Sequence, residues 1–299
     1  MKNSKSICSL FIISLVITGC NFSKGIKTDL KTGLTYAYNG FRVEGVKAYD
    51  TYLKPLKGNK LPETSTLHLE IDNIKGPVET EGKIYPGCSL TVTDKEGNVL
   101  IDKDDLYKDT ENGLSPEEFV KPIIKVVLAN PIVAGKVYTV RARFYDKKKE
   151  SSYLEVNMDV ELTPSEQNIG VSARGLAYER VFFDSEKTGP LPCNKVLANT
   201  NAGLGFAGLQ GFAEQDGMVF PGAELIVTDS DGKQVLHEED IFKDITVGLT
   251  PDQAKMLMAI IPFQEPIKSG ATYRIKARFF DKKNENNEIT ADLDVEVIK

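Results

Sequence analysis

The chain contains an internal duplication, and this feature constrains its fold more than any other. Residues 36–162 align with residues 171–297 at a constant offset and without a gap. The longest similar segments are YTVRARFYDKK at 138–148 and YRIKARFFDKK at 273–283. A repeat of this length predicts two units that share one fold.

Alternating side chains inside each repeat indicate β-strands. Residues 140–145 read VRARFY and residues 275–280 read IKARFF. In each segment the first, third and fifth residues are apolar. A period of two places one face of a strand in the core and the other in water. Turn sequences such as DKEG at 94–97 separate these segments. The pattern predicts a mainly β chain of two tandem antiparallel β-sandwiches.

One short helix is also expected in each repeat. Ser115 and Thr250 each precede a proline, and Glu118 and Gln253 follow three residues later. A hydroxyl at the N-cap, proline at the first helical position and Glu or Gln at the third are typical of a helix start. Pro122 should end the first helix within two turns, because proline lacks the amide hydrogen.

The repeats resemble immunoglobulin-like modules that occur in tandem in uncharacterised lipoproteins of Bacteroidota. Two patterns carry the resemblance, PGxxLxVTD at 86–94 and 221–229, and ARFxDKK at 142–148 and 277–283. The resemblance implies an immunoglobulin-like sandwich for each repeat, and it implies no activity.

The beginning of the chain has the order of a secretory signal. Lys2 and Lys5 precede an apolar stretch from Ile7 to Ile17, and the small residues Thr18 and Gly19 follow. The stretch is shorter than the ~20 residues that a membrane-spanning helix needs. We therefore expect an export signal and not a permanent span.

The residues ITGC at 17–20 resemble the lipobox of bacterial lipoproteins. The resemblance implies a diacylglycerol on the thiol of Cys20 and cleavage just before that residue. Two or three acyl chains hold a protein at a membrane durably, because each buried methylene contributes ~0.8 kcal/mol. Asn21 and not aspartate follows the cysteine, which in the enterobacterial pattern implies the outer membrane.

These features divide the chain into five segments. We expect a lipoprotein signal peptide at 1–19, a lipidated tether at 20–33, β-sandwich repeats at 34–162 and 169–299, and a polar linker at 163–168. Each repeat is long enough to bury a core of its own.

The charge balance argues against nucleic acid as a partner. The chain has a net charge of -6 and a pI near 5.3, so it offers no basic field to a phosphate backbone. The partners that we expect are the membrane, through the lipid anchor, and an unknown envelope protein or glycan.

Two cysteines remain once Cys8 leaves with the signal and Cys20 takes the lipid. Cys88 and Cys193 lie in different repeats and do not align with each other. Two unpaired, mostly buried thiols are the favoured interpretation, and a disulfide between the repeats is the alternative.

The two histidines do not align with each other either, which excludes a histidine site shared by both repeats. His68 stands between Leu67 and Leu69 in an alternating segment. We therefore expect its side chain to point to solvent, and we assign catalytic duty to neither His68 nor His237.

Acidic residues near the predicted turns could converge on a calcium ion. Calcium binds six to eight oxygens, which several carboxylates can supply. The spacing departs from the EF-hand loop, and aspartate near glycine also forms turns without a metal. The candidate ligands are Asp94, Glu96, Asp102, Asp229 and Asp231. No other cofactor is expected.

Basic and aromatic side chains are the other candidates for binding. Arg141, Arg143 and Arg278 belong to basic strips that could meet an acidic glycan or protein. The alternative is a solvated strand face whose charges discourage edge-to-edge pairing. Tyr36 and Tyr38 could stack on sugars, although tyrosines in strands also serve ordinary packing.

The sequence favours a lipid-anchored, non-enzymatic module of the cell envelope, which either binds a partner or acts as a structural spacer. A glycan-binding accessory lipoprotein is one alternative. A hydrolase that uses carboxylates of residues 102–105 is another, and it would need two facing carboxylates in a cleft. No catalytic residue is assigned, because no nucleophile, base and orienting partner are expected to converge.

Overall fold

The structure is a computed structural model that describes residues 24–299. The expected signal peptide and Cys20 therefore lie outside the described residues. The protein is mainly β, with 56% of its residues in strands and 3% in helical turns, and its sheets are predominantly antiparallel. None of the helical turns in this range is long and apolar enough to cross a membrane.

The first half forms two sheets. One has the order β1-β2-β10-β9-β6-β7, with β4 added in parallel to β10, and the other has the order β3-β5-β8. The strands are β1 (Lys24–Thr28), β2 (Thr35–Asn39), β3 (Gly45–Tyr49), β4 (Lys60–Pro62), β5 (Thr66–Asp72), β6 (Pro86–Asp94), β7 (Val99–Lys103), β8 (Ile123–Val127), β9 (Val137–Asp146) and β10 (Lys149–Thr163).

The second half repeats this plan. Its sheets have the orders β11-β20-β19-β16-β17, with β14 beside β20, and β13-β12-β15-β18. The strands are β11 (Gly170–Arg174), β12 (Arg180–Ser185), β13 (Gly189–Pro190), β14 (Lys195–Leu197), β15 (Asn201–Ala207), β16 (Pro221–Thr228), β17 (Gln234–Glu238), β18 (Met256–Pro262), β19 (Thr272–Asp281) and β20 (Asn284–Ile298).

Most equivalent strands begin and end at aligned residues of the duplication. Strand β18 begins two residues earlier than β8, and the ends of β12 and β16 differ by one residue from those of β3 and β6. The longest hairpin is β9–β10 in the first half and β19–β20 in the second, and both hairpins occupy the same aligned positions. Alternating burial along these strands agrees with the period-two pattern of the sequence. Strand β1 has no counterpart in the second half.

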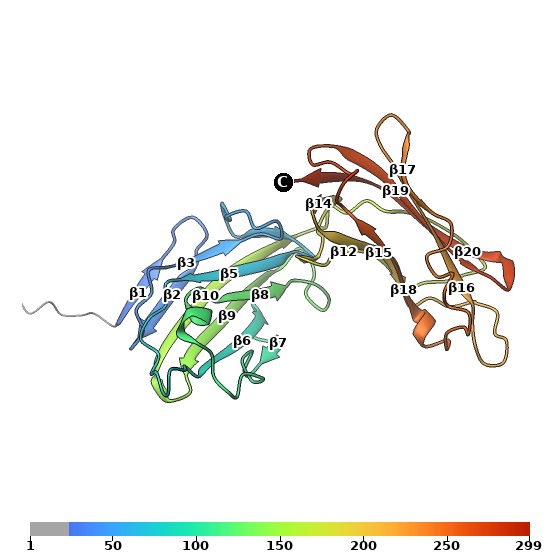
Figure 1. The fold of residues 1–299 in the computed structure, drawn as a ribbon. Coiled ribbons are helices and arrows are strands. Elements are labelled where there is room, and N and C mark those ends of the chain that lie inside the picture. Colours follow the sequence, from blue (N-terminus) through green and yellow to red (C-terminus); the bar gives the residue numbers. More distant parts are fainter. Residues whose placement is uncertain (1–23) are drawn as a thin grey trace, which may run out of the picture.

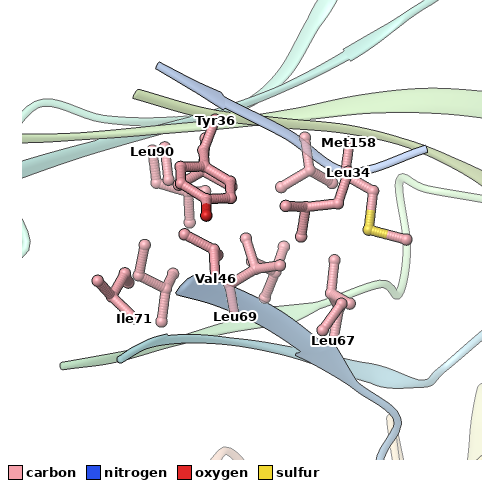
Figure 2. Close-up of a cluster of buried hydrophobic side chains, with 14 of the residues drawn as sticks. Leu34, Tyr36, Val46, Leu67, Leu69, Ile71, Leu90 and Met158 are labelled. Carbon is pink, nitrogen blue, oxygen red and sulfur yellow. The ribbon is translucent and has the colours of Figure 1, made fainter. Parts of the chain in front are cut away.

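Each half has its own hydrophobic core, which lies between its two sheets. In the first half, Tyr36, Leu90 and Met158 from one sheet meet Val46 and Leu69 from the other (Figure 2). The second core runs from Leu176 to Val297 and includes Phe183, Phe206 and Phe279. The two cores share no buried residue, so each half is packed around its own centre.

The expected helices are absent, and this prediction is wrong. Single 3-10 turns, Pro116–Phe119 and Gln253–Lys255, stand at those places. The capping box of Ser115 and Glu118 forms as the sequence indicates. Neither 3-10 turn extends into an α-helix, however, because the residues that follow it pair as a strand, β8 in the first half and β18 in the second. In the second half, β18 begins directly at Met256.

The two halves contact each other through the start of β5 (Figure 1). Thr66 Oγ1 donates to the carbonyl of Thr188 at 2.8 Å, and Thr64 Oγ1 donates to that of Leu191 at 3.4 Å. Tyr52 Oη lies 3.1 Å from Cys193 Sγ. These polar contacts join the β3–β5 region to the β12–β14 region.

The segment at 163–168 is held by hydrogen bonds to the second half. Ser165 Oγ donates to the carbonyl of Pro192 at 3.0 Å, and Gln167 Nε2 donates to that of Leu191 at 2.6 Å. Glu166 also forms a parallel bridge with Cys193. This segment therefore packs along the second half.

Candidate functional site

The segment that is most similar in the two repeats ends with two lysines, and the first of them forms an ion pair within its own half. In the first half, Lys147 Nζ lies 2.6 Å from Asp105 Oδ2 and also donates to the Tyr107 carbonyl. Asp105 Oδ1 accepts the backbone amides of Cys88 and Tyr107 at 2.9 and 2.8 Å. Burial raises the pKa of Asp105, but the hydrogen bonds from Lys147 and the amides outweigh it and hold the pKa below its usual value.

The second half repeats this ion pair atom for atom. Lys282 Nζ lies 2.7 Å from Asp240 Oδ2 and donates to the Phe242 carbonyl. Asp240 Oδ1 accepts the amides of Ala223 and Phe242 at 3.1 and 2.9 Å. These contacts tie the segment after β17 to β16 and β19. These structural contacts explain why the aspartate and the lysine are the same in both repeats.

The other residues of the DKK segments also make structural contacts. Asp146 Oδ2 accepts the Val78 amide at 2.6 Å, and its Oδ1 accepts the Lys148 amide at 2.8 Å. Lys148 Nζ lies 4.3 Å from the centre of the Tyr85 ring, a cation–π distance. The second half repeats these contacts between Asp281 and Ala213 and between Lys283 and Phe220.

The three candidate arginines lie on the outward faces of β9 and β19, and each has a partner on the neighbouring strand. The contacts are Arg141 Nε to Asn157 Oδ1 at 2.8 Å, Arg143 over the Tyr153 ring at 5.1 Å, and Arg278 Nε to Glu288 Oε2 at 2.7 Å. These contacts are typical of a solvated strand face. Binding of an acidic partner at this strip stays a prediction.

The calcium candidates Asp94 and Asp229 each close a turn. Asp94 Oδ1 accepts the amide of Asn98 at 2.8 Å, and Asp229 Oδ1 accepts the amide of Lys233 at 2.9 Å. Within residues 24–299, no group of three or more His, Cys, Asp or Glu side chains could hold a metal ion. The remaining candidates are all exposed, namely Glu96, Asp102 and Asp231.

The acidic residues at 102–105 do not form two facing carboxylates. Asp105 lies against Lys147, whereas Asp102 and Asp104 are exposed. The arrangement that the hydrolase alternative needs is therefore absent from this segment.

The two candidate tyrosines belong to the packing of the first half. Tyr36 is only 6% exposed and points into the core between the sheets (Figure 2). Tyr38 packs against the same core, and the two rings lie 6.4 Å apart. Tyr36 therefore cannot offer its face to a sugar, because the alternation of β2 turns it inward.

The expectation that His68 points to solvent is wrong. His68 is 2% exposed, and its Nδ1 lies 3.1 Å from the Asp50 carbonyl. Burial lowers its pKa. Strand β5 is central in its sheet, and the segment that carries Asp50 lies against this side chain. His237 lies near the surface, 3.2 Å from Glu224 Oε1.

The thiols of Cys88 and Cys193 are both free, and no disulfide joins them. Cys88 lies in the first core, and burial raises the pKa of its thiol to about 12. Cys193 is half-buried at the contact between the halves, and burial raises its pKa as well.

A pocket occurs at the same aligned place in both halves, and the sequence patterns did not indicate it. In the first half it has a volume of about 310 Å³ and an apolar floor of Ile74, Ile84 and Phe119. Lys75 and Glu79 lie at its rim. The 3-10 turn forms one wall, because Pro116 and the residues after it line the opening.

The equivalent pocket of the second half is smaller, at about 180 Å³. Its floor consists of Leu209, Val219 and Ala254, which align with the floor residues of the first pocket. Phe212 takes the place of a proline at its edge. Small-molecule and cofactor sites are typically concave and largely apolar, with volumes from roughly 300 Å³. The first pocket reaches this size, and the second does not.

Comparisons with known proteins leave the family of this chain open. No family model matches the sequence, and no curated protein matches it. A crystal structure of a Salmonella alpha-2-macroglobulin mutant is 11% identical, with 88% of this chain and 18% of that chain covered and a TM-score of 0.25. A structure called pT26-6p is 9% identical, with coverages of 92% and 65% and a TM-score of 0.22. The chain thus spans less than two thirds of either protein.

Proposed function

We propose that the protein is a lipid-anchored, non-enzymatic binding module of the cell envelope, held at the outer membrane through Cys20. The observation that carries the proposal is the lipobox-like ITGC at 17–20, which follows a short apolar stretch and two lysines. Such a segment is an export signal, and acyl chains on the cysteine replace a spanning helix.

The proposed architecture is a pair of tandem immunoglobulin-like sandwiches. Support comes from the repeated sheet orders, from the separate cores, and from the side-chain contacts that hold equivalent loops in both halves. The charged residues repeated between the halves, such as Asp105 and Lys147, are engaged in these contacts. This engagement supports a binding or structural role over catalysis.

The binding part of the proposal rests on the repeated pocket. An apolar floor with charged residues at the rim suits an apolar group of a partner, such as a protein side chain. The first pocket is the better candidate because of its larger volume.

The lipid anchor is tested by metabolic labelling with palmitate. We expect the wild-type protein to be labelled and to sediment with membranes. The Cys20→Ser variant should be neither labelled nor retained in the membrane fraction. Equal labelling of both forms, or an unlabelled wild type, would contradict the anchor.

The pocket is tested by photo-crosslinking in living cells. A photoreactive amino acid at Val120, at the rim of the first pocket, should yield a crosslinked product. The same amino acid at Val99, which is 55% exposed on β7, is the matched control. A product of equal yield from both positions would argue against binding at the pocket.

A further inference from the structure

The outward face of the β13-β12-β15-β18 sheet differs in chemistry from its counterpart in the first half. In the first half, Lys121 precedes β8 and Lys125 lies within it. The aligned residues of β18 are Met256 and Ile260. The side chains of Met256, Met258 and Ile260 are 61%, 37% and 47% exposed.

Strand β15 carries glycines on this same face. Gly203 and Gly205 align with His68 and Glu70 of the first half. The Met258 side chain lies across Gly203, where a Cβ atom would collide with it. A groove of about 480 Å³ results, lined by Gly203, Met258 and Ile260 among others. The outward face of β8 carries Ile123, Lys125 and Val127, so the duplication has kept the sheet and replaced the charged residues of this face with apolar ones.

Strand β18 is also an edge strand whose outer side is unpaired. Among residues 24–299 it pairs with β15 only. Proteins usually protect such edges with lysine, proline or other interruptions. Lys121, Pro122 and Lys125 provide this protection at β8, whereas MLMAIIP at 256–262 contains no charged residue and only a terminal proline.

We propose that β18 pairs with β18 of a second copy of this chain, antiparallel and around a two-fold axis at Met258. This register places Met256 opposite Ile260 of the second copy, on the same face of the joined sheet. This register pairs residues 256–260 with one another, and none of these five residues is charged, so the strand is complementary to itself over this length. The joined sheet would run through both copies.

The size of the contact indicates a weak and concentration-dependent dimer. A single strand pair buries less than the ~1,200 Å² of a standard stable interface. Confinement of both copies to one membrane raises their effective concentration and favours pairing. The pairing itself does not depend on the anchor, so the outcome of its test is independent of the outcome at Cys20.

Disulfide trapping tests the pairing in the full chain. At a two-fold centre, the Cα atoms of the two Met258→Cys residues would lie about 4.5–5.5 Å apart, which is within the range of about 4.4–6.8 Å that a disulfide bridges. With diamide as oxidant, we expect a reducible species of twice the 33.0 kDa monomer mass. Its yield should exceed that of Ile123→Cys, the aligned position on β8, by about tenfold. The wild type gives the background from the native cysteines.

A second substitution makes the result specific. Ile260→Lys copies the lysine that stands at the aligned position of β8, so the fold should tolerate it. Added to Met258→Cys, it should reduce the trapped dimer at least fivefold while leaving the circular dichroism spectrum unchanged. Equal trapping by Met258→Cys and Ile123→Cys, or a trapped product with a different protein, would overturn the proposal.

Discussion

Single residues explain why some positions are identical in the two repeats. Asp105 and Asp240 each bind a lysine and two backbone amides, and both side chains are mostly shielded from water. Their geometry depends on the carboxylate and on the lysine together. A repeated charged residue thus serves the loop that it holds, although the sequence alone leaves open whether such a residue is catalytic.

Loss of the carboxylate charge should destabilise each half. Asp105→Asn removes the charge-assisted bond from Lys147, and bonds of this kind contribute about 2 kcal/mol. We expect a loss of this size in the free energy of unfolding, measured by urea denaturation at pH 7. Asp104→Asn, at an exposed neighbour, should change it by less than about 0.5 kcal/mol.

The same pair predicts a pH dependence. The pKa of Asp105 is lower in the folded protein than in the unfolded chain. Its contribution is therefore complete above the unfolded pKa of about 3.9, and it is lost as the pH falls through the folded pKa. The difference in stability between wild type and Asp105→Asn should shrink below about pH 4. A constant difference down to pH 2 would contradict this assignment.

The two free thiols should differ in reactivity. Cys88 is fully buried and Cys193 only partly, and the thiolate is the reactive form. We expect iodoacetamide at pH 8 to modify Cys193 before Cys88, with peptide mass mapping as the measurement. Faster modification of Cys88 would place it outside the core.

At the scale of elements, the sequence patterns identified strands well and their surroundings poorly. Alternation along residues 140–145 and 275–280 is local, so it identified β9 and β19. The surroundings of His68 on β5 depend on the segment that carries Asp50, which is distant in sequence, so the expectation of an exposed side chain is wrong. The sequences of the two 3-10 turns contain helix-start signals, but the residues after each turn form a strand, so no helix develops. The pockets and the apolar face of β18 arise from several strands and have no local signal.

The repeated proline–glycine pair at the start of β6 and β16 has a packing reason. The Tyr145 ring lies over Gly87, and the Phe280 ring lies over Gly222, where a Cβ atom would collide with each ring. Gly87→Ala should therefore displace the ring and cost about 2 kcal/mol of stability. Gly45→Ala, on β3 with open space around it, is the control and should be nearly neutral. Calorimetric or urea unfolding measures both.

At the scale of the whole molecule, two features join the halves. One is the contact at Thr66, and the other is the segment at 163–168, which is hydrogen-bonded to the second half. Thr66→Val removes the donor to the Thr188 carbonyl, which is buried at this contact. We expect a loss of about 1 kcal/mol and faster trypsin cleavage between the halves. Thr139→Val, on the exposed face of β9, is the control for a lost hydroxyl. Equal cleavage rates for the two variants would show that this contact does not restrain the halves.

The contact between the halves uses different surfaces on its two sides, and such a head-to-tail arrangement does not close on itself. The first half contributes Thr64 and Thr66, whose aligned residues in the second half are Asn199 and Asn201. These asparagines line a hydrophilic hollow together with Glu186 and Lys187 of the second half and Lys125 of the first. Because Lys125 belongs to β8, this hollow lies between the two halves. The duplication has thus changed the side chains at this position, because threonines bond the first half to the second, whereas the aligned asparagines border a polar hollow between the halves.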